Sequence, residues 1–207
     1  METINLGPVF FTNCYIENGI EKCFIVDPGS NINLIKSKIT LPVEFVLLTH
    51  GHMDHIDMIG EFDCPIYIHE LDYEKLKNND YSLYTSFGSK PKYDFSKLNV
   101  KTVKNGDLIP FNNTFIKVIS TPGHTNGSVC YLYKDKLYSG DTLFKCSMGR
   151  TDFPTGNESD MKKSLVSLID SLDDRIRVYP GHGEHTTIHD ERLNNDFYIY
   201  YKKILNK

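Results

Sequence analysis

The sequence has few cysteines, no excess of positive charge and no long apolar run, and each absence narrows the possible functions. Its 207 residues include five cysteines, and none of them belongs to a Cys-X-X-Cys pair. An odd number without this spacing argues against both a disulfide framework and a structural zinc knuckle. We therefore expect reduced cysteines that are mostly buried as small apolar residues.

Charge and hydropathy exclude two further classes of partner. The net charge is −4 and no basic stripe is present, so a nucleic-acid partner is not expected. No apolar run approaches the roughly 18 residues that span a bilayer. The first residues also lack the basic start and apolar core of a secretion signal. We expect a cytoplasmic protein, monomeric or homodimeric, that acts on a small molecule and has no membrane partner.

Short strands and helices alternate along the chain. The predicted strands are Asn13–Ile16, Cys23–Val26, Val43–Leu48, Cys64–Ile68, Phe115–Ser120, Ser128–Tyr133, Lys136–Ser139 and Arg177–Tyr179. The predicted helices are Asn33–Lys38, Ile56–Phe62, Glu70–Lys77, Ser159–Leu172 and Asp190–Leu205. Asn78–Leu98 is predicted to be a long loop, and such loops are often functional. Without a linker or repeat, the pattern predicts one domain over residues 1–207, of the mixed α/β (α+β) class.

Four places share one local pattern, in which a β-type run ends and a glycine-containing turn carries a polar side chain. The places are His50-Gly51-His52-Met53-Asp54-His55, His124 after Pro122-Gly123, Asp141 after Ser139-Gly140, and His182 after Pro180-Gly181. If the strands lie side by side, these side chains converge at one sheet edge. Independent draws from this composition would give His-X-His-X-Asp-His in roughly one chain in 1000, so the run indicates a metal site.

The residue types at these four places suit divalent metal ions. Imidazole and carboxylate bind zinc, iron or manganese, and the absence of cysteine ligands argues against a closed structural zinc site. Seven candidate ligands are too many for one tetrahedral ion. They suit two ions roughly 3.5–4 Å apart that share a bridging carboxylate and a bridging hydroxide. His69 and His189 are interpreted as surface or capping residues, and His185 as a candidate support for a ligand.

In this order along the chain, the motifs resemble those of the metallo-β-lactamase superfamily, and Val26-Asp27-Pro28-Gly29 matches its usual leading motif. The resemblance runs from about Cys14 to His182 and implies a four-layer αββα sandwich with the metals at one edge. It implies the following assignments: His50, His52 and His124 bind one metal, Asp54, His55 and His182 bind the second, Asp141 bridges them, and Asp27 supports the ligands. Two zinc ions are expected, with iron or manganese as alternatives.

Within the superfamily the chain is most similar to the glyoxalase II group, through Gly149–Pro154 and Gly181–Gly183. This resemblance implies a thioester hydrolase in which Asp54 is catalytic and orients the attacking hydroxide. Arg150 is expected either to bind a substrate carboxylate or to form a structural ion pair. Only about 25 residues follow His182, so the resemblance does not extend to the C-terminal helical domain with which glyoxalase II grips glutathione.

Two other functions remain compatible with the same motifs. Persulfide dioxygenases share the fold, the histidine run and the Gly-Arg-Thr-Asp-Phe motif, and hold a single iron on the equivalents of His50, His124 and Asp141. A metal-binding protein without catalysis is the third class. The motifs alone do not separate these alternatives from a hydrolase.

Overall fold

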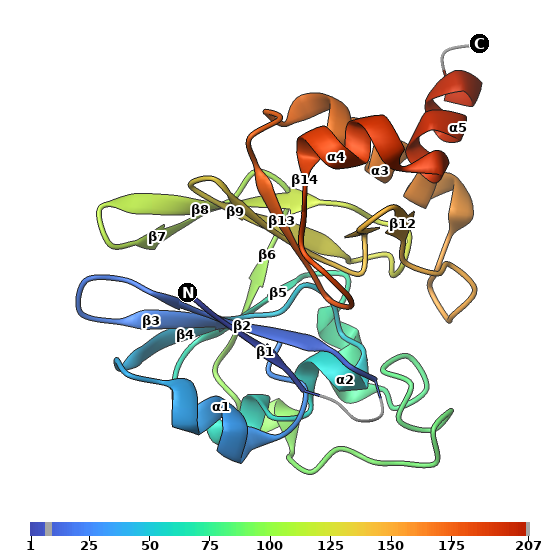
Figure 1. Ribbon diagram of the computed structural model, residues 1–207. Helices are drawn as coiled ribbons and strands as arrows, with labels where there is room; N and C mark the ends of the chain where they lie inside the picture. Colours follow the sequence, from blue (N-terminus) through green and yellow to red (C-terminus); the bar gives the residue numbers. More distant parts are fainter. Residues whose placement is uncertain (7–9, 206–207) are drawn as a thin grey trace.

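The computed structural model describes residues 1–6 and 10–205 (Figure 1). The strands are β1 Glu2–Asn5, β2 Asn13–Asn18, β3 Cys23–Val26, β4 Val43–Leu47, β5 Ile66–His69, β6 Val100–Val103, β7 Leu108–Phe111, β8 Thr114–Ser120, β9 Val129–Tyr133, β10 Lys136–Gly140, β11 Leu143–Phe144, β12 Ser147–Met148, β13 Arg177–Pro180 and β14 Thr186–Thr187. The α-helices are α1 Ile32–Lys38, α2 Met53–Ile56, α3 Glu158–Ser171, α4 Ile188–Asn194 and α5 Asp196–Leu205, and 3-10 turns cover Ile59–Glu61, Tyr73–Lys77 and Phe95–Lys97. Across these described ranges, no helix combines the length and the apolar character that crossing a membrane requires.

Two sheets pack face to face, and helices cover their outer faces (Figure 1). Within the described residues the strand orders are β1-β2-β3-β4-β5-β6 and β14-β13-β10-β9-β8-β7, while β11 and β12 form a small hairpin. The layer between the sheets is rich in buried aromatic side chains, such as Phe24, Phe111 and Tyr131. Ile35 of α1 and Ile56 of α2 belong to a second core under the first sheet, and α3, α4 and α5 share a third core with the other sheet. The predicted four-layer αββα sandwich is confirmed.

Strand direction explains why the predicted ligand turns meet at one place. β3 and β4 are parallel, and β8, β10 and β13 all run in one direction because β9 is antiparallel to both β8 and β10. The turns that carry the candidate ligands follow β4, β8, β10 and β13, and Thr12 immediately precedes β2 at the same edge. Backbone hydrogen bonds join the sheets there, from Val129 N to Thr49 O (2.9 Å) and from Asn13 N to Gly181 O (2.7 Å).

The strands β1, β6, β7, β11, β12 and β14 are not predicted from the sequence, because short strands depend on pairing more than on composition. Two predicted helices are also wrong. The predicted helix Ile56–Phe62 is replaced by α2, which ends at Ile56, and by the turn Ile59–Glu61. Glu70–Lys77 forms only the 3-10 turn Tyr73–Lys77.

The predicted helix Asp190–Leu205 is interrupted at Asn195, so it forms the two helices α4 and α5. Asn195 is fully buried, and its amide oxygen accepts a hydrogen bond from Tyr198 N (3.2 Å), which caps α5. Its amide nitrogen donates to Glu191 Oε2 (2.7 Å) and to Ser147 O (3.0 Å). Glu191, also fully buried, accepts from Cys146 N (2.9 Å) and Thr186 Oγ1 (2.7 Å). These contacts fasten the β11–β12 hairpin to the C-terminal helices.

His69 lies in the core at the end of β5, so its prediction as a surface or capping residue is wrong. Its side chain bridges the two sheets. Nδ1 accepts a hydrogen bond from Leu71 N (3.2 Å), and Nε2 therefore carries the proton and donates to Ser120 Oγ (3.1 Å). Burial lowers the pKa of His69 below its ordinary value of 6.5, so the folded protein holds the neutral imidazole.

We expect His69→Gln to weaken the pH dependence of stability in mildly acidic solution. The stability that neutral His69 contributes is present above pH 6.5 and is lost as the pH falls toward the lowered pKa of the folded state, because the unfolded chain binds the proton first. One such group changes the free energy of unfolding by at most about 1.4 kcal/mol per pH unit. Urea unfolding between pH 7 and pH 5 measures the slope, and equal slopes for both proteins would contradict this role.

Candidate metal centre

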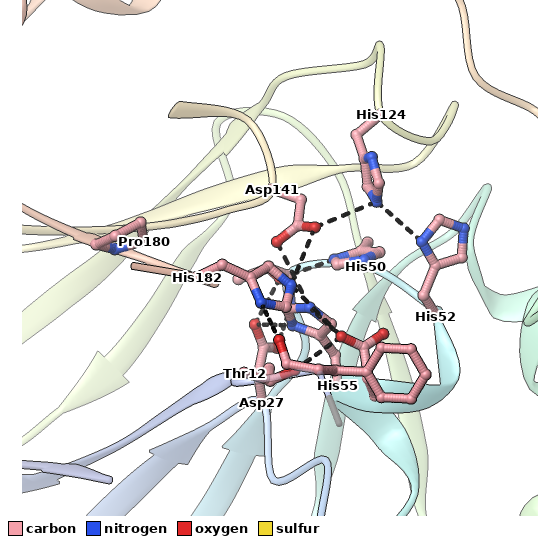
Figure 2. Close-up of polar contacts among 12 residues, drawn as sticks. Thr12, Asp27, His50, His52, His55, His124, Asp141, Pro180 and His182 are labelled. Atoms are coloured by element: carbon pink, nitrogen blue, oxygen red, sulfur yellow. Dashed lines mark hydrogen bonds and ion pairs between the residues drawn. The ribbon is translucent and has the colours of Figure 1, made fainter. Parts of the chain in front are cut away.

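The structure brings all seven predicted ligands together where the two sheets meet. Figure 2 labels each of them except Asp54. They form three overlapping groups, and within each group the candidate ligand atoms all lie within 4.8 Å of one another. The groups are His50–His52–His124, His50–His55–Asp141 and Asp54–His55–His182. Most of these side chains are buried, while Asp54 and His182 are partly open to solvent. The arrangement therefore offers donors to two neighbouring cations and is accessible from one side.

Hydrogen bonds to the outer ring nitrogens fix how the imidazoles are oriented. His55 Nδ1 lies 2.9 Å from Asp27 Oδ2, His124 Nδ1 donates to Arg150 O (2.7 Å), and His182 Nδ1 donates to Phe10 O (2.9 Å). Each acceptor requires a proton on Nδ1, which leaves the lone pair on Nε2. In all three residues, Nε2 is the atom that faces the cluster.

A short chain of hydrogen bonds links His50 to Asp27. Thr49 donates through its backbone N (2.8 Å) and its Oγ1 (2.6 Å) to the Asp27 carboxylate, and Thr49 Oγ1 lies 3.1 Å from His50 Nδ1. Because the hydroxyl proton is already given to Asp27, Thr49 can accept the proton of His50. Asp27 thus supports His50 and His55 from behind, the position expected of a residue that orients ligands without binding metal.

Asp141 lies between the two groups of histidines. Its Oδ2 is 3.5 Å from His124 Nε2 and 3.4 Å from His182 Nε2, and its Oδ1 is 3.5 Å from His55 Nε2. One carboxylate therefore faces donors of both groups. This is the geometry that a bridging ligand requires.

The donor set fits divalent cations because buried lone pairs converge without hydrogen-bond donors. His50 Nε2, His55 Nε2 and Asp141 Oδ1 are buried and make no hydrogen bond. Leaving such atoms unpaired is costly unless another group meets them. His52 Nδ1 and His124 Nε2 also approach to 2.9 Å. A shared cation satisfies these lone pairs simultaneously.

The electrostatics of the first group favour neutral ligands. Burial, reinforced by neighbouring imidazoles, lowers the pKa of His50 and of His52 well below 6.5. Both rings are therefore neutral at pH 7, which is the form that binds metals.

The second group is governed by its carboxylates. Burial alone would raise the pKa of Asp54 and of Asp141, but His55 and His182 outweigh it and hold both pKa values well below their usual range. Burial alone would likewise lower the pKa of His182, but Asp141 and Asp54 raise it to about 10. The carboxylates thus bind cationic charge strongly at this place, and a divalent ion would displace the imidazole protons.

Close packing at Gly181 depends on the absence of a side chain. A Cβ at this position would meet Asp141 Oδ1 and lie 2.8 Å from His55 Cε1. Gly140 has a φ of 48°, and a Cβ there would meet the side chain of Thr49. The glycines that precede Asp141 and His182 therefore let ligands from different strands approach each other.

With this geometry in view, comparison with known proteins identifies the family. Residues 7–182 match the sequence profile of the metallo-β-lactamase superfamily, and this range contains all seven candidate ligands. The chain belongs to the metallo-β-lactamase superfamily. An uncharacterized protein of Mycobacterium tuberculosis is 37% identical over 205 residues, which cover 89% of this chain and 92% of that protein. A probable metallo-hydrolase of Bacillus subtilis, YqgX, is 34% identical over 206 residues, which cover 93% and 94%.

Solved structures of the superfamily are also similar. The B3 metallo-β-lactamase BLEG-1 superposes with a TM-score of 0.85 at 32% identity, over 95% of this chain and 98% of that chain. TTHA1623, crystallised in a di-iron-bound form, superposes with a TM-score of 0.80 at 29% identity, over 95% and 100%.

Arg150 and His185, for which the sequence suggests roles near the site, make contacts away from the donor atoms. The Arg150 guanidinium forms a bidentate ion pair with Asp152 (2.6 Å for both bonds) and lies 4.0 Å from the centre of the Phe153 ring. Of the two roles expected for Arg150, the structure shows the ion pair. His185, a candidate support for a ligand, packs instead against Tyr179, with ring centres 4.6 Å apart.

The support given by Asp72 and Lys75 has no signal in the sequence. Asp72 is fully buried, and its carboxylate accepts hydrogen bonds from Gly51 N (2.8 Å) and Thr125 Oγ1 (2.9 Å). Lys75, only 2% exposed, lies 2.7 Å from Asp72 and donates to Asn126 Oδ1 (2.8 Å). This buried ion pair therefore ties the His50–His52 turn to the His124 turn.

Proposed function

We propose that the protein is a metal-dependent hydrolase with a dinuclear site that holds two zinc ions, and that it cleaves thioesters. The observation that carries the dinuclear proposal is the group Asp54–His55–His182, which stands beside His50–His52–His124. A single ion would leave three of these donors without a cation. The description of YqgX as a probable metallo-hydrolase and the di-iron form of TTHA1623 support the same proposal.

Two divalent ions at this site would supply a nucleophile at neutral pH and polarise the carbonyl of the substrate. The residues of the chain would hold and orient these parts. His50, His52 and His124 would bind the first ion, Asp54, His55 and His182 the second, and Asp141 both. Iron or manganese would suit the same donors as zinc.

Asp54 is the residue best placed to act on the nucleophile. Thr12 Oγ1 donates a hydrogen bond to Asp54 Oδ2 (2.7 Å), which fixes the carboxylate, and Asp54 also lines the open cleft. Because neighbouring His55 keeps the pKa of Asp54 low, the side chain is an ionised carboxylate that can accept a hydrogen bond from water. We therefore assign Asp54 the roles of ligand and of catalytic residue that orients the attacking water.

The thioester part of the proposal rests on the resemblance of Gly149–Pro154 and Gly181–Gly183 to the glyoxalase II group. These segments lie at the site, since Arg150 O accepts the hydrogen bond of His124 and His182 belongs to the donor set. Small thioesters are therefore the first substrates to test.

The test measures metal content and two reactions on the same protein. We expect two ions per chain. We also expect thioester hydrolysis under nitrogen, which is measured by the release of thiol. The same preparation should consume no oxygen with glutathione persulfide. One iron per chain, oxygen uptake and no thioester hydrolysis would instead identify the dioxygenase that needs only His50, His124 and Asp141. Metal binding without either reaction would identify a binding protein.

A further inference from the structure

The cleft that opens on the candidate ligands has mainly apolar walls. Its volume is about 480 Å³, and His52, Asp54, His124, Asp141 and His182 lie on one side. The apolar walls consist of Phe10, Leu83, Phe87, Phe144, Met148 and Phe153. A substrate that reaches the metal centre must therefore place its non-reacting groups against these side chains.

The walls come from separate segments that are fastened around the site. Phe10 and Phe87 meet edge to face with ring centres 5.0 Å apart, which joins the segment before β2 to the loop at residues 78–98. That loop is attached to α2 through the hydrogen bond from Met53 N to Ser82 O (2.9 Å). A second bond runs from Tyr84 Oη to Asp57 Oδ1 (2.6 Å). The apolar wall is thus built onto the helix that carries Asp54.

Two side chains of this loop, Leu83 and Phe87, line the cleft. Leu83 has a φ of 71°, a left-handed conformation that a leucine rarely adopts, and yet its side chain is only 3% exposed. Phe87 remains 49% exposed although its ring is large. Aromatic side chains that line a cleft together with a few polar groups are typical of a ligand-binding site.

The charged side chains of the cleft also bear on which substrates it can bind. Among the described residues that line it, Arg150 is the one lysine or arginine. Its guanidinium is already paired with both oxygens of Asp152. Away from the metal centre, the cleft consequently offers no uncompensated cationic side chain to the carboxylates of a charged substrate, while burial of an apolar group against its walls is favourable.

We propose that the cleft selects thioesters with an uncharged, apolar group beside the scissile bond, in preference to thioesters of charged peptide thiols. The proposal deepens the proposed hydrolase function and rests on it. Phe87 and the other wall residues provide the selectivity, and the metal centre provides the reaction.

The test compares two thioesters that share the phenylacetyl group, one made with benzyl mercaptan and one with glutathione. For each, kcat/KM of the metal-loaded protein is divided by the rate constant of hydroxide-catalysed hydrolysis, which removes differences in intrinsic reactivity. We expect the benzyl thioester to be preferred at least tenfold. Equal values, or a preference for the glutathione thioester, would overturn the inference.

A binding measurement keeps the inference separate from the proposed function. If neither thioester is hydrolysed, the hydrolase proposal fails, and calorimetry then decides the selectivity. The ligands are N-benzylphenylacetamide, which is uncharged, and phenylacetylaspartate, which carries two carboxylates. We expect the uncharged amide to bind at least tenfold more tightly, and equal or weaker binding would overturn the inference.

Matched variants locate the selectivity in the cleft wall. Phe87→Ala should reduce the preference for the benzyl thioester, or for the uncharged amide, at least fivefold. Phe115→Ala is the control, because Phe115 on β8 is 56% exposed and does not line the cleft. A preference that survives Phe87→Ala, or that falls equally in both variants, would contradict the assignment of Phe87.

Discussion

Replacing Asp54 by alanine is expected to remove one of the two metal ions and to reduce kcat/KM for a thioester by at least about 10³-fold. The variant deletes a proposed ligand of the second group, which is also the carboxylate that we propose to orient the attacking water. It also leaves Thr12 Oγ1 without the acceptor that lies 2.7 Å away in the intact protein. Metal analysis and steady-state kinetics measure both effects on the same sample.

Asp63→Ala is the matched control for this variant, because Asp63 is exposed and lies outside the donor set. It should retain two ions and full activity. If Asp54→Ala kept its activity, the two-metal mechanism would be wrong. If it lost activity but kept both ions, Asp54 would act on the nucleophile without being needed as a ligand.

Asp72→Ala is expected to destabilise the fold by about 3–5 kcal/mol, because it leaves the buried Lys75 ammonium without its partner. It also removes the acceptor of Gly51 N and Thr125 Oγ1, which position the turns of His52 and His124. Affinity for the first metal should therefore fall by roughly 10- to 100-fold. Urea unfolding of the metal-free protein and competition with a chelator measure the two effects separately.

Glu74→Ala, in the 3-10 turn that Asp72 precedes, provides the control. Glu74 pairs with Lys77 at the same spacing of three residues (3.0 Å), but both side chains are exposed. This variant should change neither stability nor metal affinity appreciably, since exposed pairs contribute little. Equal effects of the two variants would show that burial of the Asp72–Lys75 pair is unimportant.

The sequence predicts those features of the fold and of the donor set that depend on short local patterns. Each candidate ligand stands in a short pattern of strand, glycine and polar residue, as in Ser139-Gly140-Asp141, and such patterns are local. Strand β4 is predictable because apolar residues occupy four of its five positions. These local signals are sufficient for the mixed α/β class and for the meeting of the seven side chains. The αββα architecture follows from the resemblance of the motifs to the metallo-β-lactamase superfamily.

What cannot be predicted depends on contacts between distant segments. Asp72 reaches Gly51 and Thr125, which are 21 and 53 residues away. From sequence alone, Asp72 and Lys75 resemble an ordinary solvated pair. The break at Asn195 has the same origin, because a buried hydrogen-bond network outweighs local helix propensity.

The contacts of Glu191 and Asn195 connect the outer helices to the entrance of the cleft. Phe144 and Met148 line the cleft from the β11–β12 hairpin, whose turn donates Cys146 N to Glu191. A domain fused after α5, or a cut within α4, would therefore act directly on the shape of the entrance. A change at the C-terminal helices can therefore alter which substrates fit the cleft while the candidate metal ligands stay in place.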